Sequence, residues 1–266
     1  MGFKNVLVVK EQDTEDGNFP TVKSPNPEDK EGFEIAIKMA KENDVDVIIG
    51  TDPDCDRVGI VVRDADGIYR TLTGNQTGAL LVEYILSSKK AKGTLPENGV
   101  VIKTIVTTEL AAAIAHSYGI EIMNVLTGFK YIGEKMTEFA KTGDHTYLIG
   151  FEESYGYLVG THARDKDGVV ATMLIAEMAA YYKTKGKSLY EALMDIYKKY
   201  GYYSEKTVSF VMPGKDGMEK MSQLLTDLRQ TPPTKVAGMD VVLYTDYQSQ
   251  TIKDLSLIHI SEPTRP

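Results

Sequence analysis

The chain has 266 residues of ordinary globular composition, 42% hydrophobic and 26% charged. Its 38 acidic and 30 basic side chains give a formal charge of −8, which disfavours nonspecific binding to nucleic acid or to an anionic membrane. The single cysteine, Cys55, cannot form an internal disulfide, and no apolar run approaches the roughly 18 residues of a membrane-spanning helix. We therefore expect a cytoplasmic protein with neither nucleic acid nor membrane as a partner, and the oligomeric state stays open.

Short β-branched runs and helical patterns alternate in the first quarter of the chain. Residues 5–9 and 45–49 are typical of strands, and the helix predicted between them carries an apolar stripe. Asn26 is the expected N-cap of this helix and Pro27 its first residue. After an acidic loop, residues 58–62 and a turn at residues 64–67 predict a hairpin that leads toward Tyr69.

The same alternation resumes further along and predicts an α/β fold with mixed, mostly parallel sheets covered by helices. The predicted elements are a helix at 75–87, strands at 100–106 and 120–125, helices at 169–182 and 189–198, a strand at 207–211 and a helix at 216–228. We place the domain boundaries so that the units are residues 1–71, 72–200 and 201–254, followed by a frayed tail at 255–266.

The acidic loop carries the strongest chemical signal in the sequence. Asp52, Asp54 and Asp56 follow an apolar strand directly. Two carboxylates about 4 Å apart repel by roughly 4 kcal/mol at an effective dielectric near 20, so a cation would stabilise the group. Oxygen-only ligands favour Mg²⁺ or Ca²⁺ over zinc, and an EF-hand is excluded because Arg57 and Arg63 occupy its glycine and glutamate positions.

Two other interpretations of the acidic loop stay open on these residues alone. Asp and Pro are common in solvated turns, so the three acids could simply form one. Alternatively, Asp52 and Asp54 have the spacing of the nucleophile and the proton donor in a phosphatase of the haloacid dehalogenase type, although Cys55 and Asp56 fit the continuation of that motif poorly.

At this loop the sequence resembles the α-D-phosphohexomutases, and most closely their bacterial phosphoglucomutase and phosphomannomutase branch. The family's metal loop reads Asp-x-Asp-x-Asp-Arg, which residues 52–57 reproduce. The resemblance implies that Asp52, Asp54 and Asp56 bind one Mg²⁺ and that Arg57 is catalytic, stabilising the phosphoryl group in transfer.

Residues 150–156 resemble the family's sugar loop, Gly-Glu-Glu-Ser-Phe/Tyr-Gly, with one inserted residue after the first glycine. The resemblance gives Glu152 and Ser154 the role of binding sugar hydroxyls. The chemistry is reasonable by itself, because side chains two residues apart in an extended loop project to the same side and can bond neighbouring hydroxyls.

Two further segments resemble substrate-binding loops of the family, at residues 127–133 and 164–168. The second is similar to the family's Arg-Glu-Lys-Asp-Gly before a helix, which implies a catalytic role for Lys166 against the substrate phosphate. The other substrate-binding residues that these segments suggest are Thr127, Gly128, Lys130, His162 and Arg164.

The resemblance covers nearly the whole chain and implies the later part of the metal-binding domain, the sugar-binding domain and the start of a fourth domain. Such enzymes interconvert hexose 1-phosphate and hexose 6-phosphate through a phosphoserine, with glucose 1,6-bisphosphate as intermediate and activator. Ser24-Pro-Asn-Pro27 only partly resembles a phosphoserine loop. We therefore expect a hexose phosphate ligand, glucose or mannose, and no turnover by this chain alone; a non-catalytic Mg²⁺ and sugar-phosphate-binding module is the alternative.

Overall fold

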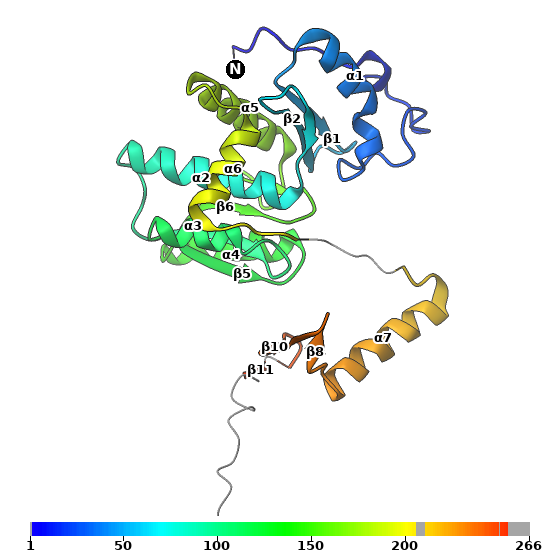
Figure 1. The fold of residues 1–266 in the computed structure, drawn as a ribbon. Coiled ribbons are helices and arrows are strands. Elements are labelled where there is room, and N and C mark those ends of the chain that lie inside the picture. Colours follow the sequence, from blue (N-terminus) through cyan, green and yellow to red (C-terminus); the bar gives the residue numbers. More distant parts are fainter. Residues whose placement is uncertain (1, 206–210, 250, 255–266) are drawn as a thin grey trace, which may run out of the picture. The chain divides into compact units, whose positions relative to one another are not determined.

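The computed structural model describes residues 2–205, 211–249 and 251–254 (Figure 1). Its contacts divide the chain into two compact units, Met1–Glu205 and Lys206–Pro266. Both units mix helices with strands, so the predicted α/β class is confirmed. Parallel pairing is confined to the strands β5, β4 and β6, and the other strand pairs are antiparallel.

The first sheet is an antiparallel meander that carries the acidic loop between its first two strands. It has the order β1-β2-β3 and comprises β1 (Val47–Thr51), β2 (Val58–Arg63) and β3 (Tyr69–Thr71). The turn that joins β2 to β3 closes with a 3.0 Å hydrogen bond from Gly67 N–H to the carbonyl of Asp64. Helix α1 (Glu34–Asn43) packs on the face of this sheet that contains Ile48 and Val61.

Two expectations for the first quarter of the chain are wrong. Residues 5–9 form no strand, and Val6 and Leu7 are exposed, because no neighbouring strand in the described part of the chain pairs with them. Asn26 accepts a bond from the N–H of Glu28 in a local turn, and Pro27 is buried. The helical segment instead begins after Asp29, whose carboxylate caps the 3₁₀ turn η2 (Lys30–Phe33). Another 3₁₀ turn, η1, spans Lys10–Gln12 near the start of the chain.

The second sheet lies between helices on both faces. Its order is β5-β4-β6-β7, with β4 (Gly99–Thr104), β5 (Glu121–Val125), β6 (Thr146–Phe151) and β7 (Tyr157–Leu158). Val101 faces the core under α2 (Gly74–Ala91) and α3 (Leu110–Ser117), whereas its neighbours Val100 and Ile102 face α4 (Phe129–Thr142). This alternation explains why β4 is buried along its whole length.

Helices α5 (Gly168–Thr184) and α6 (Leu189–Tyr200) join the two sheets of the first unit into one core (Figure 1). Val58, Ile60 and Val62 on β2 are fully buried in the cluster that also contains residues of α2, α5 and α6. The three core segments that carry loops of the candidate site, β2, β6 and α5, therefore share one apolar core.

The second unit contains α7 (Gly214–Gln230) and two short hairpins, formed by β8 (Lys235–Val236) with β9 (Met239–Asp240) and by β10 (Leu243–Asp246) with β11 (Thr251–Asp254). The predicted helix at 216–228 is confirmed within α7. The strand predicted at 207–211 falls largely on residues 206–210, which lie outside the described part of the chain. The expected tail at 255–266 also lies outside it. None of the described helices is both long and apolar enough to cross a membrane.

Candidate metal centre and adjoining loops

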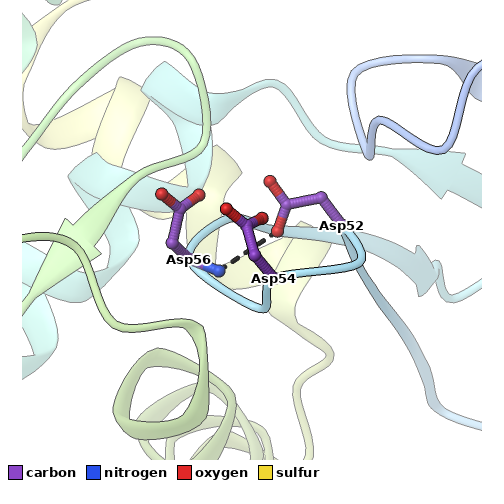
Figure 2. Close-up of side chains that lie close together, drawn as sticks. All are labelled: Asp52, Asp54 and Asp56. Carbon is purple, nitrogen blue, oxygen red and sulfur yellow. Dashed lines mark hydrogen bonds between the residues drawn. The ribbon is translucent and has the colours of Figure 1, made fainter.

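The acidic loop connects β1 to β2 and gathers its three aspartates. One carboxylate oxygen from each of Asp52, Asp54 and Asp56 lies within 4.8 Å of the others, and Figure 2 shows the three side chains turned to the same side of the loop. Cys55 makes this possible with a left-handed φ of 58°, which bends the chain between Asp54 and Asp56. The loop thus presents a cluster of oxygen donors that could hold a metal ion.

The local charge at this cluster is unfavourable without a cation. The Oδ1 of Asp52 accepts a bond from the N–H of Asp56 (3.1 Å; Figure 2) and another from the N–H of Arg57 (3.0 Å), and the two bonds fix its orientation. Burial, together with the charges of Asp56 and Asp54, nevertheless raises the pKa of the Asp52 carboxyl. A divalent cation beside these oxygens would relieve both the burial cost and the repulsion.

Two basic side chains flank the acid cluster. The Nε of Arg57 lies 3.8 Å from Oδ2 of Asp52 and 3.9 Å from Oδ1 of Asp56, and this buried nitrogen has no hydrogen-bond partner among the described residues. The Lys166 ammonium donates to Oδ2 of Asp56. Burial alone would lower the pKa of Lys166, but its bond to Asp56 and the charge of Asp165 outweigh that effect and raise the pKa. An incoming phosphate would therefore meet two cations beside the acids.

Helix α5 begins directly against the acidic loop. The N–H of Gly168 donates to the carbonyl of Cys55 (3.0 Å), and a Cβ at position 168 would lie 2.6 Å from that same oxygen. Asp167 caps the helix by accepting from the N–H groups of Val169 and Val170. Asp167 is not among the predicted site residues, although an aspartate just before an apolar helical run is a recognisable N-cap signal.

Replacing Gly168 by alanine is expected to lower the free energy of unfolding by about 2 kcal/mol, because the new methyl group meets backbone and cannot be accommodated by a rotamer change. Gly17→Ala is the matched control, since nothing lies within 4 Å of a Cβ there and its φ is not left-handed. Urea denaturation of both variants measures the difference. Equal stabilities would contradict the close packing of α5 on the loop.

The loop at residues 150–156 runs beside the acidic loop and is bonded to it. The N–H of Val58 donates to the carbonyl of Tyr155 (3.0 Å), and Arg57 and Gly156 form an antiparallel bridge. Within the loop, the N–H of Glu152 donates to the carbonyl of Gly156 (2.9 Å). Two segments about 100 residues apart in sequence are thereby held together at the ends of β1, β2 and β6.

Glu152 connects this loop to the start of α4. Its Oε1 accepts from the N–H of Gly128 at 2.9 Å, so two of the residues that sequence analysis selected are in direct contact. The side chain is buried, and this burial raises the pKa of the carboxyl. Ser154 is half-buried on the same loop, and Thr127 is exposed next to Gly128.

The pKa of Glu152 predicts a pH-dependent stability difference from Glu152→Gln, which keeps an oxygen acceptor for Gly128. Because the folded-state pKa is raised, folding favours the protonated acid, so the wild-type chain loses stability relative to the variant as pH rises from the unfolded pKa of about 4.3 through the folded one. Urea unfolding in EDTA between about pH 4 and pH 7 should show this gap opening with pH. A gap that closes with pH would contradict it.

Lys130, Arg164 and Lys166 line two surface hollows of about 640 and 550 Å³ that share Arg164 and Asp165. Lys130 is exposed at the first, with its ammonium 4.9 Å from the ring centre of Tyr131. Lys166 lines the second together with Asp54 and Asp56. The two hollows place lysines on both sides of Arg164.

Arg164 and His162 have internal partners. The Nη1 of Arg164 donates to the carbonyls of Thr161 (2.8 Å) and Ala163 (2.9 Å), which fixes the loop before α5. His162 Nε2 lies 2.8 Å from Oδ2 of Asp167. Both side chains therefore help to hold the loop that carries Lys166, in addition to any role in binding substrate.

Comparison with known proteins identifies the family of this α/β fold. Residues 1–67 match domain II and residues 73–200 match domain III of the family described as phosphoglucomutase/phosphomannomutase, both of alpha/beta/alpha type. The chain belongs to the phosphoglucomutase/phosphomannomutase family.

Individual relatives agree with this assignment. The chain is 37% identical over 249 residues to the phosphoglucomutase of Staphylococcus haemolyticus, a match that covers 94% of this chain and 44% of that protein. It is 35% identical over 266 residues to the phosphoglucomutase of Staphylococcus saprophyticus, covering 100% of this chain and 48% of the relative. The chain thus spans about half the length of these relatives.

A solved structure shows the same fold. The phosphoglucomutase/phosphomannomutase family protein of Burkholderia thailandensis matches with a TM-score of 0.57 at 21% identity, and the match covers 85% of this chain and 42% of that protein.

Proposed function

We propose that this chain carries the metal-binding and sugar-binding parts of a phosphohexomutase, which interconverts hexose 1-phosphate and hexose 6-phosphate by way of a phosphoserine and a bisphosphate. The observation that carries the proposal is the backbone connection between the acidic loop and the Glu152 loop at Val58 and Gly156. Such a connection keeps a cation and a sugar at a fixed separation, which phosphoryl transfer requires.

The donor set of the acidic loop fits Mg²⁺, because among the described residues three carboxylates converge there with no histidine or cysteine in the group. In this proposal Asp52, Asp54 and Asp56 hold the ion, which would supply a fixed positive charge against phosphoryl oxygens. Arg57 and Lys166 flank that position and neutralise the remaining negative charge of a phosphate in transfer.

Substrate recognition is proposed for the loops around the two hollows. Glu152 and Ser154 bond hydroxyls of the glucose or mannose ring, while Lys130 and Arg164 attract the substrate phosphate. Thr127, Gly128 and His162 complete the wall of this site. The serine that donates the phosphoryl group, and a further loop that binds the second phosphate of the bisphosphate, would come from other parts of the enzyme. This chain therefore binds substrate without turning it over.

The proposal extends to domain organisation and location. We assign residues 1–71 to the metal-binding domain, residues 72–200 to the sugar-binding domain and residues 201–254 to the start of a further domain, with residues 255–266 as a tail outside the family pattern. The matches to domains II and III support the first two assignments. A cytoplasmic location fits an enzyme of sugar-phosphate metabolism.

Isothermal titration calorimetry tests this function. With Mg²⁺ present, glucose 1-phosphate or mannose 1-phosphate is expected to bind at least about tenfold more tightly than inorganic phosphate, because ring hydroxyls add hydrogen bonds that phosphate lacks. The same samples should not hydrolyse p-nitrophenyl phosphate. Hydrolysis that is lost in Asp52→Asn would point to a phosphatase with Asp52 as nucleophile and would overturn the proposal.

A further inference from the structure

Glu153 lies between the two proposed sugar-binding residues, yet its carboxylate bonds to a different part of the fold. Its Oε2 lies 3.1 Å from the hydroxyl oxygens of both Thr104 and Thr107. Thr104 is the last residue of β4, and Thr107 follows it in the connection to α3. We call Glu153, Thr104 and Thr107 the threonine clasp.

The clasp is buried at its threonine end. Thr104 is 0% and Thr107 3% exposed, so neither hydroxyl has bulk water as an alternative partner. The two hydroxyl oxygens are 2.6 Å apart, and each hydroxyl carries one hydrogen. The three oxygens form three close pairs, but only two hydroxyl hydrogens are available to bond them. A carboxylate fits this position because it only accepts hydrogen bonds and can accept from both hydroxyls.

A buried lysine supports the same corner. Lys103 is 0% exposed, and its ammonium donates to the carbonyl of Thr107 (3.0 Å) and to Oε1 of Glu109 (2.8 Å). This charged pair of bonds fixes the backbone at Thr107, and with it the hydroxyl that faces Glu153. The Lys103 bonds thus hold Thr107 in its place in the clasp.

The loop is also confined on its other side. A Cβ on Gly74, at the start of α2, would lie 2.0 Å from the carbonyl oxygen of Glu153 and 2.9 Å from the nitrogen of Tyr155. Tyr155 itself adopts a left-handed φ of 66°, an unfavourable conformation for a tyrosine that its surroundings must maintain. Close packing and the clasp together hold residues 153–155 in one conformation.

The direction of the side chains gives this anchoring a consequence for ligand binding. Glu152 bonds to Gly128 at the start of α4, whereas the next residue, Glu153, bonds to the end of β4. Glu153 and Ser154 lie in the turn that follows β6, and Glu152 comes directly before it, so fixing the Glu153 side chain restricts the backbone that orients both of its neighbours. In the described part of the chain, the side chains of the clasp bond to each other and make no hydrogen bond to the acidic loop, so the anchor acts directly on residues 152–154.

We propose that Glu153 is a positioning residue that binds no substrate and orients Glu152 and Ser154 toward the sugar hydroxyls through Thr104 and Thr107. This inference rests on the proposed function for the role of Glu152 and Ser154. Thr104 and Thr107 lie outside the sugar loop, at the end of β4 and in its connection to α3. The proposal is that they nevertheless help the site to bind a sugar phosphate more tightly than inorganic phosphate.

The test compares two double variants of the full chain. Thr104→Val with Thr107→Val removes both hydroxyls at nearly constant shape, and Thr104→Ser with Thr107→Ser keeps them. Calorimetry with Mg²⁺ present should show glucose 1-phosphate binding weakened about tenfold in the valine pair, with inorganic phosphate and Mg²⁺ affinities unchanged within about twofold. The serine pair should behave as wild type. If the folded valine pair binds all three ligands more weakly to the same extent, the proposal is overturned.

Hydrogen exchange followed by mass spectrometry decides the question independently of any ligand. The peptide covering residues 150–157 should exchange about tenfold faster in the valine pair, because its anchor is lost, while peptides of α4 stay unchanged. Unchanged exchange would overturn the clasp. If wild type binds no glucose 1-phosphate, the proposed function is wrong. The exchange result still shows whether the clasp anchors residues 150–157. If the valine pair does not fold, Thr107→Val alone is measured in the same way.

Discussion

Replacing Asp54 by asparagine is expected to weaken Mg²⁺ binding by about 100-fold, at the upper end of what the loss of a metal-site partner costs. Asp54 is the exposed member of the three acids, so the change leaves no buried group without a partner. The substitution keeps the size of the side chain and removes one of three converging charges. The expected loss therefore comes from ligation and charge, with little effect on the fold.

Asp165→Asn is the matched control for Asp54→Asn. Asp165 lines the same hollow and carries the same charge, but it is not one of the three clustered acids. Calorimetry with Mg²⁺ at neutral pH and moderate salt should show the control within about threefold of wild type, as expected for a nearby charge that is screened by solvent. Equal losses in both variants would mean that only the general negative field attracts the ion.

Phe151→Ala is expected to lower the free energy of unfolding by about 4 kcal/mol, a large fraction of the stability of a typical domain. Phe151 is 0% exposed at the end of β6, directly before the Glu152 loop. Its ring fills the space beside Gly78, where a Cβ would lie 2.1 Å from a ring carbon, and it stacks on Tyr157 with centroids 6.3 Å apart. Truncation leaves a cavity that neither the helix nor the tyrosine can close.

The conservative variant Phe151→Leu retains most of the buried volume and should cost only about 1 kcal/mol. Urea denaturation of the two variants separates cavity formation from the loss of the aromatic stack. If Phe151→Ala unfolds at the same urea concentration as wild type, the junction between β6, β7 and α2 does not hold the loop in the way described here.

Local sequence signals predicted most of the fold of the first unit. The hairpin of β2 and β3 follows from a β-branched run and an Asp-Gly turn, both contained within residues 58–71. The first helical segment is capped by Asp29 and not by the predicted Asn26, and the fate of residues 5–9 depends on contacts that no local pattern encodes. A β-branched run becomes a strand only if another strand pairs with it, and residues 5–9 have no such partner among the residues that the structure describes.

In the candidate site, too, some features follow from the local sequence and others depend on contacts between distant residues. The three aspartates are within five residues, and their spacing alone indicated that they would converge, as Asp52, Asp54 and Asp56 do. The bond from Lys166 to Asp56 joins residues 110 positions apart, and the bonds from Glu153 to Thr104 and Thr107 join residues 49 and 46 apart. Such contacts result from the packing of β4, β6 and α5, and only the folded chain shows them.

Anomalous diffraction from crystals of this chain soaked in Mn²⁺, which binds oxygen ligands much as Mg²⁺ does, tests the central claim most directly. The account predicts one strong peak that is bonded to carboxylate oxygens of Asp52, Asp54 and Asp56 at about 2.1 Å, beside Arg57 and Lys166. A peak at other acids, with the three aspartates separated from one another, would contradict it.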